Sequence, residues 1–358
     1  MKIFKTTLLA LALLAGSLTY AQDELVTEEV SVEATEKKPS FSVSGSIDTY
    51  YRSNDYAPNT SFANLPGFAL GMANVVLSYE GEKSGFVADL VYGPRGADAV
   101  FGSEGTSSSI INQLYAYYNV NEKLTLTLGN FNTFLGYEVI SPVANFNYST
   151  SYMFSYGPFS HTGIKADYAF SDDISLMVGV FNQTDFTEGN FEYDGAGGIT
   201  PYDDYMYGVQ LGLYGQYINL LTGKLPGDET YTQIDFTGGF DLSDSFFLGI
   251  NATNTSFEND RSFSGIALYP QLALSDSFSI GLRGELFKET ESGAGAISLT
   301  TEDADNTSFT ITGSYTSGNL IIKPEFRIDS ANADIYSKSI TEMSDSLASF
   351  VVAAIYAF

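Results

Sequence analysis

The only histidine of the chain, His161, is the first candidate for chemistry, because acyl-transfer enzymes place a histidine base beside a nucleophile. Ser160 precedes it, and Ser155, Asp167 and Ser171 are close in the sequence. Nothing in the sequence marks one serine as a nucleophile, since no GxSxG motif occurs. A lone histidine just before a strand is most simply a polar loop residue. We therefore predict no catalytic residue and no enzyme.

Metal and cofactor sites are equally poorly supported. Zinc and other transition metals need several histidine or cysteine ligands, and the chain has one histidine and no cysteine. Acidic residues gather in 184–204 and 302–305, and Ca²⁺ accepts such oxygen ligands, but no EF-hand spacing is present. Nucleotide-binding GxGxxG and P-loop patterns are absent as well. We predict no metal site and no cofactor, and we interpret the acidic residues as solvated loops.

The charged residues with the most regular spacing lie in the stretch 320–329, LIIKPEFRID. Charged side chains alternate there with apolar ones, and the charged set is Lys323, Glu325, Arg327 and Asp329. A helix would scatter these four charges around its circumference, whereas a strand puts them in one row because its side chains repeat every two residues. The stretch is therefore predicted to be a strand with one charged and one apolar face.

Two other predicted strands carry charges in the same way, Lys165 with Asp167 and Arg283 with Glu285. If the apolar faces meet lipid, all eight charged side chains face an enclosed, water-filled lumen. Mixed charges facing each other across a pore would create a transverse field and tune ion selectivity. Alternatively, they are paired wall residues that only stabilise the structure. The two interpretations do not exclude each other.

Composition indicates the kind of structure that must position these rows. Hydrophobic residues make up 44% of the chain and charged residues only 16%, below the roughly 25% of ordinary soluble domains. Glycine (34), tyrosine (25) and phenylalanine (27) are abundant, tryptophan is absent, and no run of about 18 apolar residues follows the N-terminal segment. These features favour an all-β fold, a transmembrane antiparallel up-and-down β-barrel. A soluble secreted β-sandwich is the alternative.

The chain divides into three parts. Residues 1–21 form a signal peptide, with Lys2 and Lys5 before a short apolar stretch and small residues before Gln22. Residues 22–40 are acidic and lack aromatic side chains, as expected of a disordered periplasmic leader, and residues 41–358 form the barrel. The formal charge of −27 argues against nucleic acid as a partner and suits cations, or lipopolysaccharide bridged by divalent ions.

The connections between predicted strands support the barrel more than any single strand does. Short polar turns, such as 80–85 and 170–174, alternate along the chain with long links. The long links are 53–69, 94–108, 133–159, 184–203, 290–305 and 331–345. Outer-membrane barrels sort their connections in this way, with tight periplasmic turns and long outer loops. The count gives about sixteen strands, with 204–231 as the ambiguous region.

The C-terminal strand and the strand ends agree with this interpretation. The chain ends in SFVVAAIYAF, whose last residue, Phe358, resembles the signal by which the barrel-assembly machinery recognises outer-membrane barrels. Aromatic side chains also occur at strand ends beside the short turns and are predicted to form an interfacial girdle. The girdle residues are Tyr79, Phe170, Phe240, Phe278 and Phe358.

The link 133–159 is the longest and holds a single charge, Glu138. A loop of 27 residues is usually functional or disordered, and its aromatic side chains argue against disorder because they are costly to leave in water. The aromatic residues we single out are Tyr137, Tyr148, Tyr152 and Phe154. The loop can fold inward and narrow the lumen or outward across the mouth. We predict Glu138 as a constriction residue, although it could merely cap a turn.

Within residues 129–163, the patterns GNF-x-T-x-LGYE, N-x-NYS-x-SY and GPFSHTG resemble the β-barrel porin-2 (OmpL-like) family of outer-membrane proteins, common in Bacteroidetes. The matching residues include Gly129, Tyr137, Glu138, Tyr148 and His161. More loosely, the resemblance extends from Phe41 to Phe358. It implies a porin-like barrel in the outer membrane of a Gram-negative bacterium and no enzyme, and it supplies no substrate.

Together these observations predict a porin-like channel for passive diffusion of small hydrophilic solutes or ions, mildly cation-preferring because of the acidic excess. The alternative is a non-conducting outer-membrane barrel whose outer loops serve adhesion or surface structure. The expected partners are outer-membrane lipid and lipopolysaccharide, the barrel-assembly machinery, and the solutes or ions themselves. A homotrimer is compatible with the sequence.

Overall fold

The computed structural model describes residues 38–358, except 59, 104–107, 194–197, 259–260 and 291–302. The predicted signal peptide and almost all of the predicted leader lie outside the described residues. In the described part of the chain, no helix is both long and apolar enough to cross a membrane.

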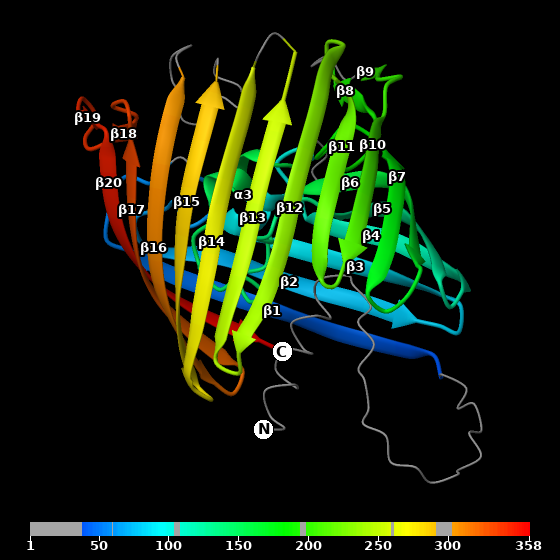
Figure 1. The fold of residues 1–358 in the computed structure, drawn as a ribbon, viewed down its shortest axis with the longest axis horizontal. Coiled ribbons are helices and arrows are strands. Elements are labelled where there is room, and N and C mark those ends of the chain that lie inside the picture. Colours follow the sequence, from blue (N-terminus) through cyan, green and yellow to red (C-terminus); the bar gives the residue numbers. More distant parts are fainter. Residues whose placement is uncertain (1–37, 59, 104–107, 194–197, 259–260, 291–302) are drawn as a thin grey trace.

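Sixteen antiparallel strands form a closed barrel, as predicted (Figure 1). In chain order they are β1 (Ser40–Arg52), β2 (Gly67–Glu80), β3 (Ser84–Tyr92), β4 (Ile111–Asn121), β5 (Leu124–Asn132), β6 (Ser160–Ala169), β7 (Ile174–Phe181), β10 (Met206–Leu213), β11 (Gln216–Leu225), β12 (Glu229–Ser243), β13 (Phe246–Ser256), β14 (Ser262–Ser275), β15 (Phe278–Thr290), β16 (Ala304–Ser317), β17 (Leu320–Ala331) and β20 (Ser346–Ala357). Each strand pairs with the next, and β20 pairs with β1 to close the sheet. The ambiguous region 204–231 contains β10, β11 and the start of β12.

Strand β17 illustrates why the sequence forms this wall. Its side chains alternate strictly, so that Phe326 and Ile328 are 41% and 43% exposed on the outer face. The charged row that begins at Lys323 lies on the inner face, and each of its four side chains is at most 3% exposed. The alternation thus sets an apolar exterior against a polar lumen, which is the pattern of a membrane barrel.

The connections sort into two ends, also as predicted. Tight turns join the strands at the end where the C-terminus lies, and the long loops lie at the opposite end (Figure 1). Two links at that opposite end, β11–β12 and β13–β14, are short as well. The long loops contain two small hairpins, β8 (Phe191–Tyr193) with β9 (Ile199–Pro201), and β18 (Tyr336–Ser337) with β19 (Met343–Ser344). They also contain the short helices α2 (Pro94–Ala99) and α3 (Tyr152–Tyr156).

The predicted aromatic girdle is exposed on the barrel exterior. Its side chains are between 36% and 56% exposed, and all five belong to strand ends beside short turns or to the C-terminus. They are Tyr79, Phe170, Phe240, Phe278 and Phe358. Amphipathic and aromatic rings at this level suit the boundary between lipid and water.

Candidate functional site: a segment folded into the lumen

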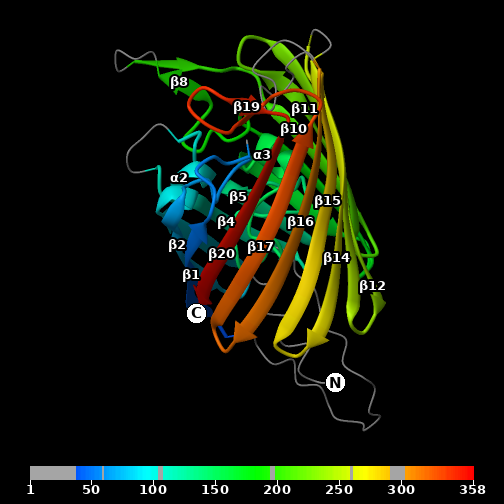
Figure 2. The ribbon, with the colours of Figure 1, turned by 90° about the vertical axis from the view of Figure 1, so that its left-hand side faces the viewer.

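Residues 133–159, hereafter the inner segment, fold into the barrel. The segment leaves β5 and returns to β6, and the N–H of Thr133 donates to the carbonyl of Phe159 at 2.9 Å where the two ends meet. Its helix α3 lies between opposite walls of the barrel in both views (Figures 1 and 2). Tyr148 and Tyr152 are fully buried. Of the two arrangements that the sequence left open, the structure has the inward one.

Two wall carboxylates hold the backbone of the inner segment. Glu325 of β17 accepts the N–H groups of residues 148 and 149, at 2.7 and 3.0 Å. Glu285 of β15 accepts those of residues 152 and 153, at 2.9 and 2.8 Å. Buried N–H groups need acceptors, and ionised acceptors make the stronger bonds. The two carboxylates therefore fix both ends of a six-residue stretch.

Three arginines hold the carbonyl groups of the same stretch. Arg95 of α2 donates to the carbonyl of residue 148 at 3.3 Å, Arg283 to that of residue 149 at 2.6 Å, and Arg327 to that of residue 150 at 2.8 Å. Arg95 also donates to the carbonyl of Ile140 at 2.9 Å. Consecutive peptide groups are thus bound by charged side chains from three different elements, which defines one position for the segment.

The one charge of the segment, Glu138, forms a buried ion pair with Arg283. The Arg283 Nη1 to Glu138 Oε1 distance is 2.7 Å, and the side chains are 0% and 3% exposed. The other carboxylate oxygen of Glu138 accepts the N–H of Ser151 at 2.7 Å. Glu138 therefore links the segment to β15 and also links two parts of the segment, residues 138 and 151, to one another. Its predicted role at a constriction stays a prediction, because this carboxylate is enclosed in the described state.

Further polar contacts distribute the attachment around the barrel. Tyr148 donates its hydroxyl to Asp48 of β1, and the N–H of Gly136 donates to Asp235 of β12 at 3.0 Å. Lys323 of β17 donates to the carbonyls of Pro142, at 2.9 Å, and of residue 145. The inner segment is held from opposite sides of the lumen.

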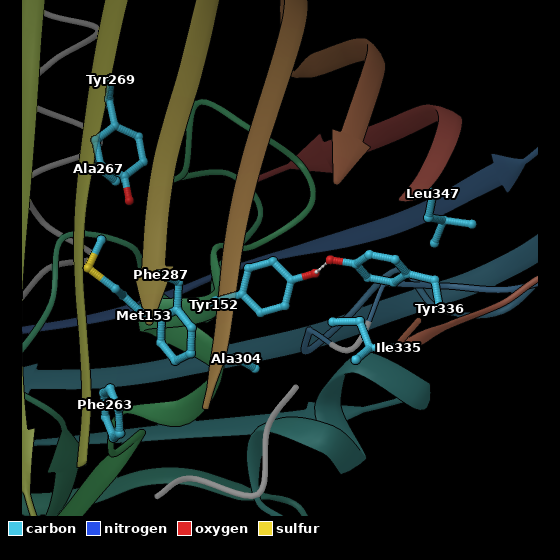
Figure 3. Packing of buried hydrophobic residues seen from close by; sticks show 10 residues of the cluster. All are labelled: Tyr152, Met153, Phe263, Ala267, Tyr269, Phe287, Ala304, Ile335, Tyr336 and Leu347. Atoms are coloured by element: carbon cyan, nitrogen blue, oxygen red, sulfur yellow. Dashed lines mark hydrogen bonds between the residues drawn. The ribbon is translucent and has the colours of Figure 1, made fainter. Parts of the chain in front are cut away.

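Apolar packing fills the space between these polar contacts. Tyr152 and Met153 pack against Phe263 and Phe287 of the wall, and the hydroxyls of Tyr152 and Tyr336 lie 3.1 Å apart (Figure 3). Elsewhere around the barrel, the segment joins three more buried clusters. Its members there are Leu135, Ile140, Tyr148, Phe154 and Phe159. This burial explains why so aromatic a loop does not stay in water.

Glycines of the wall receive large side chains of the segment. A Cβ on Gly249 of β13 would lie 2.5 Å from the ring of Tyr137, and one on Gly281 of β15 would lie 2.4 Å from Phe146. Real Cβ atoms do not approach other atoms so closely, so any larger residue would displace these rings. The wall therefore matches the inner segment both in shape and in charge.

A cavity of about 220 Å³ remains beside the segment. Tyr137 and Tyr269 stack on one another at its edge, with ring centroids 4.3 Å apart. Its lining residues are Tyr137, Glu138, Val139, Ala144, Asn145, Phe146, Asn147 and Tyr269.

The predicted charged rows divide into two groups. Arg283, Glu285 and the β17 residues Lys323, Glu325 and Arg327 all contact the inner segment. Asp329 instead binds Arg327, at 2.8 Å from Nη2 to Oδ1.

Lys165 and Asp167 of β6 stand apart from this group. Their Nζ and Oδ2 atoms are 3.1 Å apart, and the side chains are 21% and 41% exposed. They belong to the half of β6 nearer the short turns, where the lumen is accessible to solvent.

His161 has a packing role in the structure. It is fully buried and its ring stacks on Phe181 with centroids 4.9 Å apart. Its Nε2 lies 2.9 Å from the hydroxyl of Thr133, while Ser155 bonds within the loops, to Ser61 and Ser151. No group of three or more potential metal ligands occurs among the described residues.

Sequence reasoning missed Arg95, Asp48 and Asp235 as partners of the segment. Asp48 and Asp235 occupy the polar face of alternating strands, so the period-two pattern could have found them. Arg95 lies on a short helix in an outer loop, and its sequence has no signal that it turns inward.

Comparison with known proteins agrees with this architecture. A family model described as "Putative beta-barrel porin-2, OmpL-like" matches residues 40–358. The chain belongs to this family. It is accordingly a porin-like β-barrel of the Gram-negative outer membrane. No curated protein matches the sequence.

Solved outer-membrane proteins share the fold of this porin-family barrel. The outer-membrane channel DcaP of Acinetobacter baumannii has a TM-score of 0.56 at 13% identity, covering 90% of this chain and 99% of that one. An anion-selective porin from Comamonas acidovorans has a TM-score of 0.56 at 12% sequence identity, and the match covers 90% of this chain and 100% of that porin. OprD of Pseudomonas aeruginosa has a TM-score of 0.51 at 10% sequence identity, and the match covers 92% of this chain and 97% of OprD. At such identities the likeness concerns the fold alone.

Proposed function

We propose that this porin-family barrel is a narrow channel for small hydrophilic solutes or ions, whose passage is controlled by the inner segment. The observation that carries the proposal is the attachment of the inner segment to distant parts of the wall. Residues 148–153 bind charged side chains of β15 and β17, and the N–H of Gly136 binds Asp235 of β12. An open sixteen-stranded barrel is wide enough for an aqueous pore, so a segment held across it sets the limiting cross-section.

Five of the predicted lumen charges, those of Arg283, Glu285, Lys323, Glu325 and Arg327, serve in this proposal to hold the segment. Lys165 and Asp167, which remain accessible, are proposed to line the wet part of the path. The acidic excess of the chain supports a mild preference for cations, because fixed charges of one sign attract counter-ions. We also propose that the barrel forms a homotrimer and that its outer loops contact lipopolysaccharide.

The deciding experiment is single-channel current of the refolded mature chain in a planar bilayer under a KCl gradient. We expect small current steps that vary linearly with voltage, and a reversal potential whose sign shows that cations permeate more easily than anions. Glu138→Gln, which breaks the buried pair with Arg283, should raise the step size or add open bursts. Asp228→Asn is the control, since that carboxylate is 83% exposed between β11 and β12 and pairs with Lys224, and it should leave the step size unchanged.

A second candidate function has its own support. The inner segment packs into four buried clusters around the wall, and the hairpins β8–β9 and β18–β19 extend the outer end of the barrel (Figure 2). These features suit a non-conducting barrel with a surface or adhesion role. The absence of current from a well-folded barrel, in the wild type and in Glu138→Gln alike, would favour this function over the channel.

A further inference from the structure

Arg52, at the outer end of β1, is buried without a partner. Its side chain belongs to a residue that is 2% exposed, and none of Nε, Nη1 and Nη2 has a hydrogen-bond partner. The other fully buried arginines of the lumen differ from it. Arg283 pairs with Glu138, and Arg327 pairs with Asp329.

The surroundings of Arg52 contain a second cation, Arg327, which repels its charge, and one carboxylate, Asp55, which attracts that charge without forming an ion pair. Arg52 is the cross-strand neighbour of Val351, and Arg327 is that of Ser349, so the two arginines flank the same inner face of β20. Asp329 is occupied by Arg327, through three hydrogen bonds of 2.8 to 3.0 Å. No described carboxylate forms an ion pair with Arg52.

Residues 60–65 bind the neighbours of Arg52 in the lumen, Arg327 and Tyr50. Thr60 accepts a hydrogen bond from Arg327 at 3.2 Å, and the N–H of Leu65 donates to Tyr50 at 2.9 Å. Ala63 packs with Tyr50 and Val351 in one buried cluster. A ligand that binds Arg52 would therefore lie near these residues.

A buried guanidinium with no hydrogen bond to any of its donors is a costly arrangement, because the charge has lost its hydration and the attraction of Asp55 does not replace those bonds. A guanidinium binds carboxylate or phosphate through two parallel hydrogen bonds, which would remove this cost. We propose that Arg52 anchors an anion-binding site in the outer third of the lumen, which takes a small oxyanion, a carboxylate or a phosphate group. A site enclosed in this way does not oppose a cation-preferring path elsewhere in the lumen.

The test measures thermal unfolding of the refolded mature chain in detergent micelles, at fixed pH and ionic strength. Sodium chloride is replaced stepwise by sodium acetate in one series and by sodium phosphate in another. We expect the wild-type midpoint to rise by a few degrees for each roughly tenfold increase in the oxyanion that binds, because the ligand binds the folded state only. A response to acetate alone assigns a carboxylate, and a response to phosphate alone assigns a phosphate.

Variants separate this site from general salt effects. Arg52→Met should unfold at a higher temperature than the wild type in chloride, because it removes an uncompensated charge, and it should lose the response to oxyanions. Arg52→Lys should fold and weaken the response by about tenfold, since an ammonium group cannot bind bidentately. Arg261→Met, at an outer loop, should keep the full response. A wild type that responds to neither oxyanion, or an Arg52→Met that responds equally, overturns the proposal whether or not the barrel conducts.

Discussion

Glu138 and Arg283 form an ion pair that joins the only charge of the inner segment to the barrel wall, with side chains 3% and 0% exposed. Removing one member of a buried pair leaves the other charge without compensation, which costs about 3–5 kcal/mol. We expect Glu138→Gln to lower the thermal midpoint and to loosen the segment. The double variant Glu138→Gln/Arg283→Met should be less destabilised than Glu138→Gln alone. A double-mutant cycle of unfolding free energies measures this, and additive effects would contradict it.

Glu285 and Glu325 provide a matched pair for a second prediction, since each accepts two N–H groups of the segment. A glutamine offers one acceptor oxygen, so either Glu→Gln change leaves one N–H without an acceptor. The expected cost is about 1–3 kcal/mol in the free energy of unfolding for each variant. Amide hydrogen exchange should increase at residues 152–153 in the first variant and at 148–149 in the second. Equal increases at both places would argue against separate attachments.

Gly249 should tolerate no large side chain, because its wall position is filled by the ring of Tyr137. Gly249→Leu is expected to displace Tyr137 and to destabilise the barrel by about 1–3 kcal/mol, as overpacking does. Gly284→Leu is the control, since no atom lies within 4 Å of the position where its Cβ would be. Thermal midpoints and accessibility of residue 137 to chemical labelling check the prediction, which fails if the two leucine variants behave alike.

Asp185, in the loop after β7, fastens the end of the inner segment by accepting the N–H groups of Phe159 and Ser160 at 2.8 and 2.9 Å. Burial raises the pKa of its carboxyl to about 7, although the two N–H bonds act in the opposite direction. A folded-state pKa above the unfolded value of about 4 favours the protonated form, so the stabilising contribution is present at low pH and is lost as pH rises from about 4 through 7.

We therefore expect the attachment at residues 159–160 to weaken between pH 5 and pH 8, measured as faster local hydrogen exchange after correction for the intrinsic rate. Asp185→Asn keeps an acceptor oxygen and has no charge, so this pH dependence should disappear in it. A wild type and a variant with the same pH profile would show that Asp185 does not titrate in this range.

Asp167 tests the selectivity of the accessible lumen. Its side chain is 41% exposed and pairs with Lys165. Because exposed ion pairs contribute little to the free energy of unfolding, this pair is expected to add little stability. Asp167→Asn should leave the thermal midpoint unchanged and shift the reversal potential toward anions. Lys165→Gln should shift it in the opposite direction, and no shift in either variant would place the conducting path elsewhere.

The sequence by itself determined the barrel. The strict alternation of Lys323 to Asp329 with apolar neighbours is repeated in other strands and indicates walls with one polar and one apolar face. The alternation of short turns with long links favours a membrane barrel over a soluble sandwich. The approximate strand number follows from the same pattern, because strands and turns are local features of the chain, although 204–231 stayed ambiguous until the structure placed β10, β11 and the start of β12 there.

Only the tertiary structure decided what the lumen charges do. Glu325 meets Tyr148 and Glu285 meets Tyr152 across 177 and 133 residues of sequence, and no local pattern encodes these pairings. Period-two alternation shows that a side chain points into the lumen, but it does not show which residues that side chain contacts there. That depends on the path of the inner segment, which is fixed by simultaneous burial of its aromatic rings and satisfaction of its backbone by charges from distant strands.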